Sequence, residues 1–372
     1  MYYRPKFRES VIHFLYTHVF KPIVFQIDPE KIHDSMIAFG ESLGRYDWVR
    51  RVAGFLFDFQ HPMLAQRICG IDFRNPVGLS GGFDKNGRLT DILPEVGFGF
   101  MEIGSITGDK CEGNPKPRMW RLKKSRSLLV HYGLNNMGAR TIARCLRGKK
   151  FRIPVGINIA KTNNKETVLK EAGTRDYVRA YHEMRHVGDY VTLNISCPNA
   201  YGGCPFTDRE NLEYLLTKLA TVPKTKPIFI KLSPDLTEQE IDDIIVLVRR
   251  FKLDGFVCSN LTKPRENPHI FDTDFPEYGG MSGKVVDHLS DRLIEYVFRQ
   301  VGKEFVIIGV GGIFSAEDAY RKIRKGASLV QLITGMVFEG PQLIGGINYG
   351  LVCLLKRDGF QNIAEAVGVD IR

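Results

Sequence analysis

The sequence Tyr190-Val-Thr-Leu-Asn194-Ile-Ser-Cys197-Pro-Asn199 joins an apolar run to a cluster of polar and reactive side chains. The run that begins at Tyr190 predicts a buried strand. Pro198 ends it, because proline has no N–H to donate to a sheet. The strand end therefore carries a thiol between two carboxamides, and we expect it to open onto a site.

Seven further apolar runs show the same pattern and alternate with segments of helical character. The eight predicted strands cover residues 77–80, 100–103, 155–159, 191–195, 228–232, 255–259, 306–310 and 329–333. Helical patterns cover residues 166–186, 208–220, 237–251, 287–300 and 315–325. Eight strand–helix units predict an α/β fold, a parallel (β/α)8 TIM barrel. A doubly wound open sheet is the alternative, but no GxGxxG motif follows the first strand to support it.

The first 45 residues differ from the barrel and predict a small helical extension. Residues 11–25 form an amphipathic pattern too short to span a bilayer, and Asp28-Pro29 predicts the start of a second helix. These helices either pack on their own domain or form a membrane-surface anchor that admits an apolar ligand. We therefore divide the chain into an extension, residues 1–45, and a barrel domain, residues 46–372. Residues 46–75 are expected to form a connector with a short hairpin.

Composition limits the classes of partner and compartment. The net charge is +10, but the basic residues are dispersed and no basic tract is interleaved with aromatic residues, so we expect no nucleic-acid partner. The seven cysteines include no CxxC pair, which favours reduced thiols in the cytoplasm over a disulfide framework. An anionic ligand or an anionic membrane surface remains compatible with the positive charge.

Two kinds of group at the predicted strand ends suggest an anionic ligand. The loops after the last two strands carry Gly309-Val-Gly-Gly312 and Thr334-Gly335, which predict a phosphate cradle because glycine lets backbone N–H groups approach an anion. The alternative is a tight turn without a ligand. Lys85 and Lys231 also lie at strand ends, and buried lysines require anionic partners. That partner is either a ligand or an acidic neighbour such as Asp84.

Three asparagines at strand ends indicate a flat polar ligand. Asn158, Asn194 and Asn260 offer donors and acceptors to a heterocycle, although asparagine is disfavoured in strands. Together with one phosphate cradle, they predict flavin mononucleotide (FMN) and a small planar ligand. The HEMRH sequence at 182–186 matches a zinc pattern, but it lies on a predicted outer helix, so we expect no metal site.

A set of motifs across residues 60–350 resembles the dihydroorotate dehydrogenase family. The motifs are GGFDKNG at 81–87, GFG at 97–99, EIGS at 102–105, GLNNMG at 133–138, GINI at 156–159, NISCPN at 194–199, KLSPD at 231–235, GGMSG at 279–283, IGVGGI at 308–313 and GASLVQ at 326–331. The N-terminal helices, with FQIDPE at 25–30 and His33, are similar to those of the membrane-associated, quinone-using class 2 members, in which they form the quinone entrance.

The resemblance implies an activity and its setting. It implies flavin-dependent oxidation of dihydroorotate to orotate in pyrimidine biosynthesis, with FMN as cofactor and electrons passed to a membrane quinone. It further implies a peripheral protein at the cytoplasmic face of the cell membrane, and no obligatory protein partner is expected.

The resemblance also implies a role for each matched residue. Contacts to FMN are expected from Gly81, Gly82, Lys85, Ser105, Asn158, Asn194, Lys231, Ser259, Gly283, Gly312, Ile333 and Thr334. Contacts to the pyrimidine are expected from Lys85, Gly133, Leu134, Asn194, Asn199 and Asn260. Cys197 is expected to be the base that removes the C5 proton of dihydroorotate.

The chain departs from the family pattern at three positions. Cys197 stands where class 2 members carry serine, and cysteine is the class 1 residue; a thiol ionises far more readily than a hydroxyl. Val130 stands where an asparagine is usual, and Leu261 where threonine or serine is usual. These losses leave two alternatives open: a related FMN oxidoreductase acting on a different small cyclic substrate, and a flavin-binding homologue without turnover.

Overall fold

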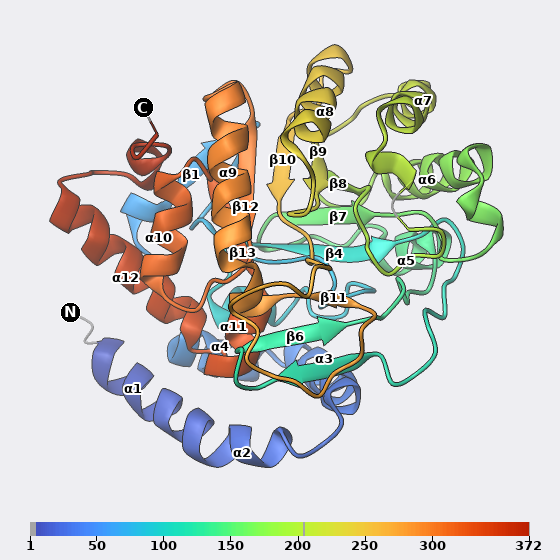
Figure 1. The fold of residues 1–372 in the computed structure, drawn as a ribbon. Helices are drawn as coiled ribbons and strands as arrows, with labels where there is room; N and C mark the ends of the chain where they lie inside the picture. Colours follow the sequence, from blue (N-terminus) through green and yellow to red (C-terminus); the bar gives the residue numbers. More distant parts are fainter. Residues whose placement is uncertain (1–4, 204, 372) are drawn as a thin grey trace.

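The computed structural model describes residues 5–203 and 205–371, and its centre is a closed barrel of parallel strands (Figure 1). Around the ring, the strands are β10 (Gly255–Cys258), β12 (Val306–Val310), β13 (Leu329–Leu332), β3 (Val77–Leu79), β4 (Phe100–Ile106), β7 (Val155–Ile159), β8 (Tyr190–Asn194) and β9 (Ile228–Leu232). Each predicted strand run overlaps one of them, although β4 extends three residues beyond its predicted end and β8 begins one residue earlier than predicted. The predicted (β/α)8 barrel is confirmed.

Large side chains fill the N-terminal end of the barrel interior. Phe100, Tyr190 and Phe229 form one buried cluster with Phe73. Phe73 belongs to the antiparallel hairpin of β1 (Gln66–Ile68) and β2 (Ile71–Phe73), which was predicted and is confirmed. Position 156 must be glycine, because a Cβ there would lie 2.2 Å from the Tyr190 ring. Since this end is packed, ligands are expected at the opposite, C-terminal end.

Helices surround the barrel. They are α5 (Ala139–Leu146), α6 (Lys170–Met184), α7 (Arg209–Leu219), α8 (Glu238–Arg250), α9 (Asp287–Val301), α10 (Ala316–Arg324) and α12 (Leu343–Asp358). The sequence predicted the middle five, while α5 and α12 were not predicted. The HEMRH sequence lies at the end of α6 in this outer ring, and the described residues contain no cluster of three metal-ligating side chains.

The N-terminal extension forms a helical arm along the lower edge of Figure 1. It comprises α1 (Pro5–Leu15), a π-helical turn (Tyr16–Phe20), α2 (Lys21–Val24) and α3 (Pro29–Gly44). As predicted, Asp28 caps α3, because its carboxylate accepts the Lys31 N–H at 2.9 Å. Residues 1–4 of the predicted extension lie outside the described residues. No helix of the described chain is both long and apolar enough to cross a membrane.

The prediction of a connector over residues 46–75 was wrong in its first part. Helix α4 (Asp47–Phe57) forms there and packs against the short helical turn Leu93–Val96 between β3 and β4. This segment of the barrel has only that turn in place of a long helix, so α4 covers it. The contact joins segments far apart in sequence, which local patterns do not reveal.

The two long insertions between strands form a small antiparallel sheet over the C-terminal end of the barrel. It contains β5 (Met119–Leu122), β6 (Ser127–Val130) and the short β11 (Gly280–Met281). Helix α3 packs against β5, and the Arg121 guanidinium donates to the Ile27 carbonyl at 2.7 Å. This sheet therefore connects the arm to the barrel mouth.

Candidate active site

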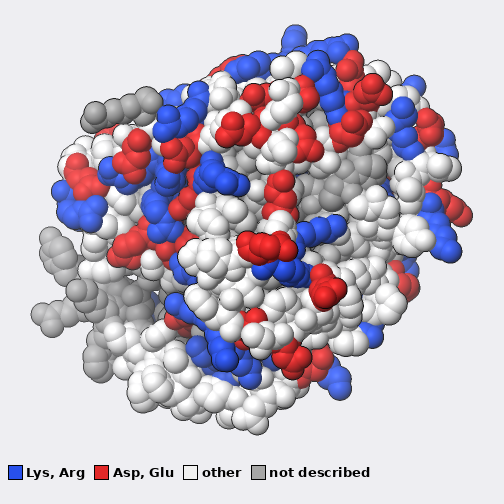
Figure 2. Space-filling view, in the orientation of Figure 1, with Lys and Arg blue, Asp and Glu red and all other residues white. Residues whose placement is uncertain are grey.

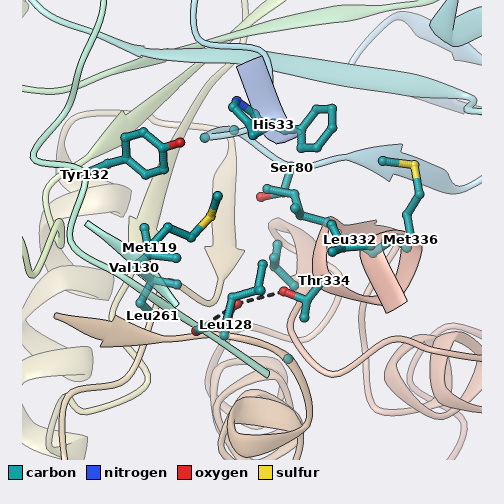
Figure 3. Close-up of a pocket in the computed structure, with 18 of the residues that line it drawn as sticks. His33, Ser80, Met119, Leu128, Val130, Tyr132, Leu261, Leu332, Thr334 and Met336 are labelled. Carbon is teal, nitrogen blue, oxygen red and sulfur yellow. Dashed lines mark hydrogen bonds between the residues drawn. The ribbon is translucent and has the colours of Figure 1, made fainter. Parts of the chain in front are cut away.

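One cavity of about 360 Å³ lies between the barrel mouth and the helical arm (Figure 3). Every residue predicted for the site except Asn158 lines it: Gly81, Gly82, Lys85, Ser105, Gly133, Leu134, Asn194, Cys197, Asn199, Lys231, Ser259, Asn260, Gly283, Gly312, Ile333 and Thr334. The structure thus brings the predicted cofactor, substrate and catalytic residues into a single space. Whether each makes the expected ligand contact stays a prediction.

A buried carboxylate that the sequence analysis did not single out organises the floor of this cavity. Glu102, on β4, accepts hydrogen bonds from Thr192 Oγ1 at 2.7 Å and from Asn158 Nδ2 at 3.0 Å. The Asn158 carboxamide oxygen in turn accepts from the Ser105 hydroxyl. Asn158 therefore lies beneath the cavity and acts through Ser105. The sequence did offer one signal for Glu102, because it is an acidic residue within an otherwise apolar predicted strand.

The amides on β8 and after β10 continue this network to the substrate side. Asn194 Nδ2 donates to Ser105 Oγ at 2.9 Å, and Asn194 Oδ1 accepts from Asn260 Nδ2 at 3.0 Å. Asn260 also donates to the Ser196 carbonyl at 3.0 Å. Since each bond requires one orientation of the amide, the donors and acceptors of the two carboxamides are fixed before any ligand binds.

Lys231 is a buried cation at the centre of the mouth. Its ammonium lies 3.4 Å from Ser80 Oγ. Burial lowers the pKa of Lys231, while the negative charge of Glu102 and the Cys197 thiolate oppose this shift. The alternative partner, Asp84, accepts four backbone N–H groups of residues 86–89 and so caps a turn. Asp84 is therefore not the partner of Lys231, and Glu102 is the acidic neighbour whose charge acts on it.

Lys85 connects the mouth to the arm. Burial lowers its pKa to about 8. Its ammonium lies 3.0 Å from His33 Nε2 on α3 and 4.0 Å from the centre of the Tyr132 ring. Burial, followed by the charge of Lys85, holds the pKa of His33 well below its usual value, so the neutral imidazole accepts a hydrogen bond from the lysine. Figure 3 shows His33 and Tyr132 at the same end of the cavity.

Cys197 lies on the loop directly after β8, half-buried in the cavity wall. Burial raises the pKa of its thiol, and the Asn199 N–H and the charges of Lys161, Lys231 and Lys263 oppose that rise. Lys161 was not singled out from the sequence, although it lines a second, small cavity beside Cys197 and donates to the Tyr201 carbonyl at 2.9 Å. The thiol has cations near it that favour its ionised form.

The loop that holds Cys197 is joined to the small sheet over the mouth. Asn199 Nδ2 donates to the Val130 carbonyl at 2.8 Å, and its Oδ1 lies 3.4 Å from His131 Nδ1. The side chains of Val130 and Leu261 line the same cavity, as Figure 3 shows. This wall is therefore apolar where the family pattern predicts two polar side chains.

The loops after β12 and β13 form the opposite wall. Position 312 has φ +72°, and a Cβ there would lie 2.3 Å from that of Asp287, so only glycine fits. The backbone N–H groups of Gly312 and Ile313 make no hydrogen bond to any residue that the structure describes. Thr334 Oγ1 lies 2.7 Å from Ser282 Oγ, the contact drawn in Figure 3. Unused backbone donors beside glycine fit a phosphate group.

The outer part of the cavity is apolar and is contributed mainly by the arm, with α11 (Thr334–Glu339) opposite it. The arm supplies Tyr16, Phe20, Val24, Phe25, Ile32 and Met36, and α11 supplies Met336 and Val337. Glu30 and Arg118 fasten α3 here through a buried ion pair with a closest distance of 2.8 Å. Burial acts to raise the pKa of Glu30, but hydrogen bonds from Arg118 and Lys116 outweigh it and hold the pKa below its usual value.

Comparisons with known proteins agree with this geometry. The model of the dihydroorotate dehydrogenase family matches residues 63–355. The dihydroorotate dehydrogenase (quinone) of Natronomonas pharaonis is 40% identical over 94% of this chain and 98% of its own length. The corresponding protein of Haloarcula marismortui is 38% identical over 94% and 98% of the two chains. The crystal structure of the DHODH of Eimeria tenella in complex with ferulenol has 28% identity and a TM-score of 0.82, covering 93% of this chain and 96% of that one. This chain belongs to the dihydroorotate dehydrogenase family.

Proposed function

We propose that this chain is a quinone-linked dihydroorotate dehydrogenase that holds FMN at the barrel mouth and takes part in pyrimidine biosynthesis. The observation that carries the proposal is one cavity that combines a polar mouth with an apolar entrance formed by the arm. The family match and the relatives named as quinone-dependent enzymes support it.

The residues at the mouth fit FMN. The unused N–H groups of Gly312 and Ile313, with the Thr334 hydroxyl, would hold its phosphate. Gly81 lines the cavity without a side chain, and a Cβ there would be crowded against Asn158 Nδ2 at 3.0 Å, so glycine keeps the backbone open to a ring. Lys231 supplies positive charge beside the ring, which favours an anionic form of it. Bound FMN would supply the redox chemistry at this position.

The substrate is proposed to lie between the flavin position and the loop after β8. Asn194, Asn199 and Asn260 would hold the edges of the pyrimidine, and Lys85 would pair with its anionic carboxylate. The Cys197 thiolate would then accept the C5 proton at Sγ. Burial raises the pKa of this thiol, and the charges of Lys161 and Lys231 offset part of that rise, so they assist formation of the thiolate that the step needs.

The arm is proposed to admit quinone and to contact the membrane at its cytoplasmic face. Large apolar side chains are exposed on it, including Phe14, Phe39 and Ile23, the last with 60% of its surface accessible. Figure 2 shows this lower edge largely free of charged residues, whereas the upper helices carry many. Contiguous exposed apolar residues mark contacts with partners or membranes. The proposal includes no obligatory protein partner.

The apolar wall at Val130 and Leu261 favours a second candidate function. Two lost polar contacts to one small ligand would cost about 1–3 kcal/mol each if the partner groups stayed unpaired. A related FMN oxidoreductase with a less polar cyclic substrate would avoid this cost. The nearby His131, tied to Asn199, is the residue that would compensate in a dihydroorotate dehydrogenase.

Anaerobic mixing of the flavin-loaded protein with a panel of cyclic substrates separates these functions. The proposal predicts that dihydroorotate bleaches the visible flavin band faster than other dihydropyrimidines or lactams do. Bleaching by another ring compound but not by dihydroorotate would overturn it in favour of the second candidate. Absence of bleaching by every compound would indicate a flavin-binding homologue without turnover.

A further inference from the structure

We propose that Lys284 is a positioning residue for the cofactor phosphate. Its ammonium binds a carbonyl on the side of the β12–α10 loop that faces away from the cavity, and so orients N–H groups of that loop toward the cavity. This inference rests on the proposed role of FMN. Lys284 does not itself line the cavity, so it acts through the loop and not by touching the ligand.

The ammonium of Lys284 has three partners. It donates to the Gly312 carbonyl at 2.9 Å, to Asp318 Oδ2 at 2.8 Å and to Asp287 Oδ2 at 3.0 Å. An ammonium has three N–H donors, so all are used. The bonds join the turn Gly283–Val286, the start of α9 and the start of α10 at one point.

Because the peptide bond is planar, a contact that fixes the Gly312 carbonyl also fixes the N–H group of the same peptide unit. The C=O of residue 312 and the N–H of Ile313 belong to one trans peptide unit and point in opposite directions. Because Lys284 holds the carbonyl at the back of the loop, the Ile313 N–H is directed to the other side. Both Gly312 and Ile313 line the cavity there.

Asp318 fixes the next peptide group of the same loop. Its Oδ2, which accepts from Lys284, also accepts the Phe314 N–H at 2.9 Å. The Ser315 hydroxyl accepts the Asp318 N–H at 3.2 Å and caps α10. The rear of the loop is thus saturated with hydrogen bonds, while the N–H groups on its cavity side are unused.

The ion-pair network on the far side of the loop has no net charge. Lys284 therefore acts by holding the loop in place and not by adding positive charge to the phosphate site. Asp287 also pairs with Arg321 at 2.8 Å, and Asp291 pairs with the fully buried Lys322 at 2.5 Å. Three cations face three carboxylates in this network: Lys284, Arg321 and Lys322 against Asp287, Asp291 and Asp318. Removal of Lys284 would release the Gly312 carbonyl and leave uncompensated negative charge behind a phosphate.

Flavin titrations of the full-length chain, freed of flavin, test this role. FMN and riboflavin share the ring but only FMN has the phosphate, so the ratio of their affinities reports on the phosphate loop alone. We expect Lys284→Met to weaken FMN binding about tenfold, the value of one charge-assisted contact, and to leave riboflavin binding unchanged. The matched control is Lys325→Met, which removes an ion pair with Glu295 between the same two helices and should change neither affinity.

The outcomes separate this inference from the proposed function. Equal FMN affinity in wild type and Lys284→Met, or an equal loss for FMN and riboflavin, would overturn the role of Lys284. A wild-type chain that binds neither flavin would instead overturn the proposed function. The milder Lys284→Gln serves if the methionine variant does not fold, and an unchanged affinity ratio in it also contradicts the inference.

Discussion

The barrel mouth buries polar and charged side chains, whereas the helical arm exposes apolar ones, and both arrangements depart from the usual pattern in proteins. At the mouth, polar and charged groups are buried: Asn158, Asn194 and Lys231 are 1%, 6% and 4% exposed. On the arm, large apolar side chains such as Ile23 face outward. Buried charge and exposed apolar surface both require an explanation. Both arrangements support the proposed ligands, a polar and anionic one at the mouth and an apolar one at the arm.

The two regions are also held differently. A continuous hydrogen-bond network from Glu102 to Asn260 fixes the mouth. The arm is fastened at separate points, such as Tyr16 Oη to the Val337 carbonyl at 2.7 Å and Lys21 Nζ to the Phe338 carbonyl at 3.0 Å. Substitutions should therefore affect one region without the other, and the predictions below are ordered by the size of that effect.

Replacing Cys197 with alanine should produce the largest effect, confined to the mouth. Loss of a positioned base costs about 10²–10⁴-fold in rate, so flavin reduction by dihydroorotate should slow by that factor. Stopped-flow absorbance measures it. Bound flavin and reoxidation by quinone should remain, because Sγ contributes to neither. Unchanged reduction would mean that Cys197 is not the base.

Replacing Arg118 with methionine should loosen the arm. It leaves the buried Glu30 carboxylate without its main partner, at a cost of about 3–5 kcal/mol. Activity with quinone should fall more than activity with a soluble dye acceptor. Arg45→Met, which removes the exposed pair with Glu41 on the same helix, is the control and should change little. Equal losses with both acceptors in Arg118→Met would contradict a role limited to the arm.

The same pair gives the arm a pH dependence. The pKa of Glu30 is lowered in the folded chain, so its stabilising contribution is present above the usual carboxyl pKa. It is lost as the pH falls through the lowered value. Limited proteolysis should therefore cleave the arm of the wild-type chain faster as the pH is lowered. In Glu30→Gln, cleavage should depend less on pH, and an identical pH profile would contradict the assignment.

Flavin reduction should rise with pH, because the base must be a thiolate. Burial raises the pKa of the Cys197 thiol, so below that pKa each pH unit should increase the rate by up to tenfold. Reduction rates across the neutral to alkaline range measure this. A flat profile would show that proton removal by the thiolate does not limit the step.

Charged substitutions on the outer face of the arm should have the smallest effect, which acts through membrane contact. Phe14→Glu and Ile23→Glu each remove an exposed apolar side chain, worth about 1.5–3 kcal/mol if buried in lipid. Co-flotation with anionic vesicles should drop by about tenfold or more for each. Val246→Glu, an exposed apolar position on α8, should float as wild type does. Equal flotation of all variants would exclude the arm as the contact.

The sequence predicted the barrel and the strand ends because both depend on local signals. Apolar runs define strands such as Tyr190–Asn194, and their C-terminal residues must meet at one mouth once the barrel is assigned. The cap at Asp28 is likewise a signal of three residues. Strand placement therefore needed no knowledge of distant contacts.

The features that were missed depend on distant contacts. Glu102 binds residues on two other strands, and His33 meets Lys85 across 52 positions of sequence. Helix α4 is defined by packing on a turn near Pro94, and the sheet over the mouth pairs Val130 with Gly280. Such pairs have no periodic pattern in the sequence, so only the folded chain reveals them.

One sequential experiment tests most directly the claim that two regions serve one bound flavin. The flavin-loaded protein is mixed anaerobically with dihydroorotate, and vesicles containing quinone are then added while the visible flavin band is followed. We predict loss of the band and then its return. Cys197→Ala should slow the loss but, once its flavin has been reduced chemically, should show a normal return, whereas Ile23→Glu should slow only the return. No loss of the band in wild type, or equal effects of both substitutions on both phases, would contradict the account.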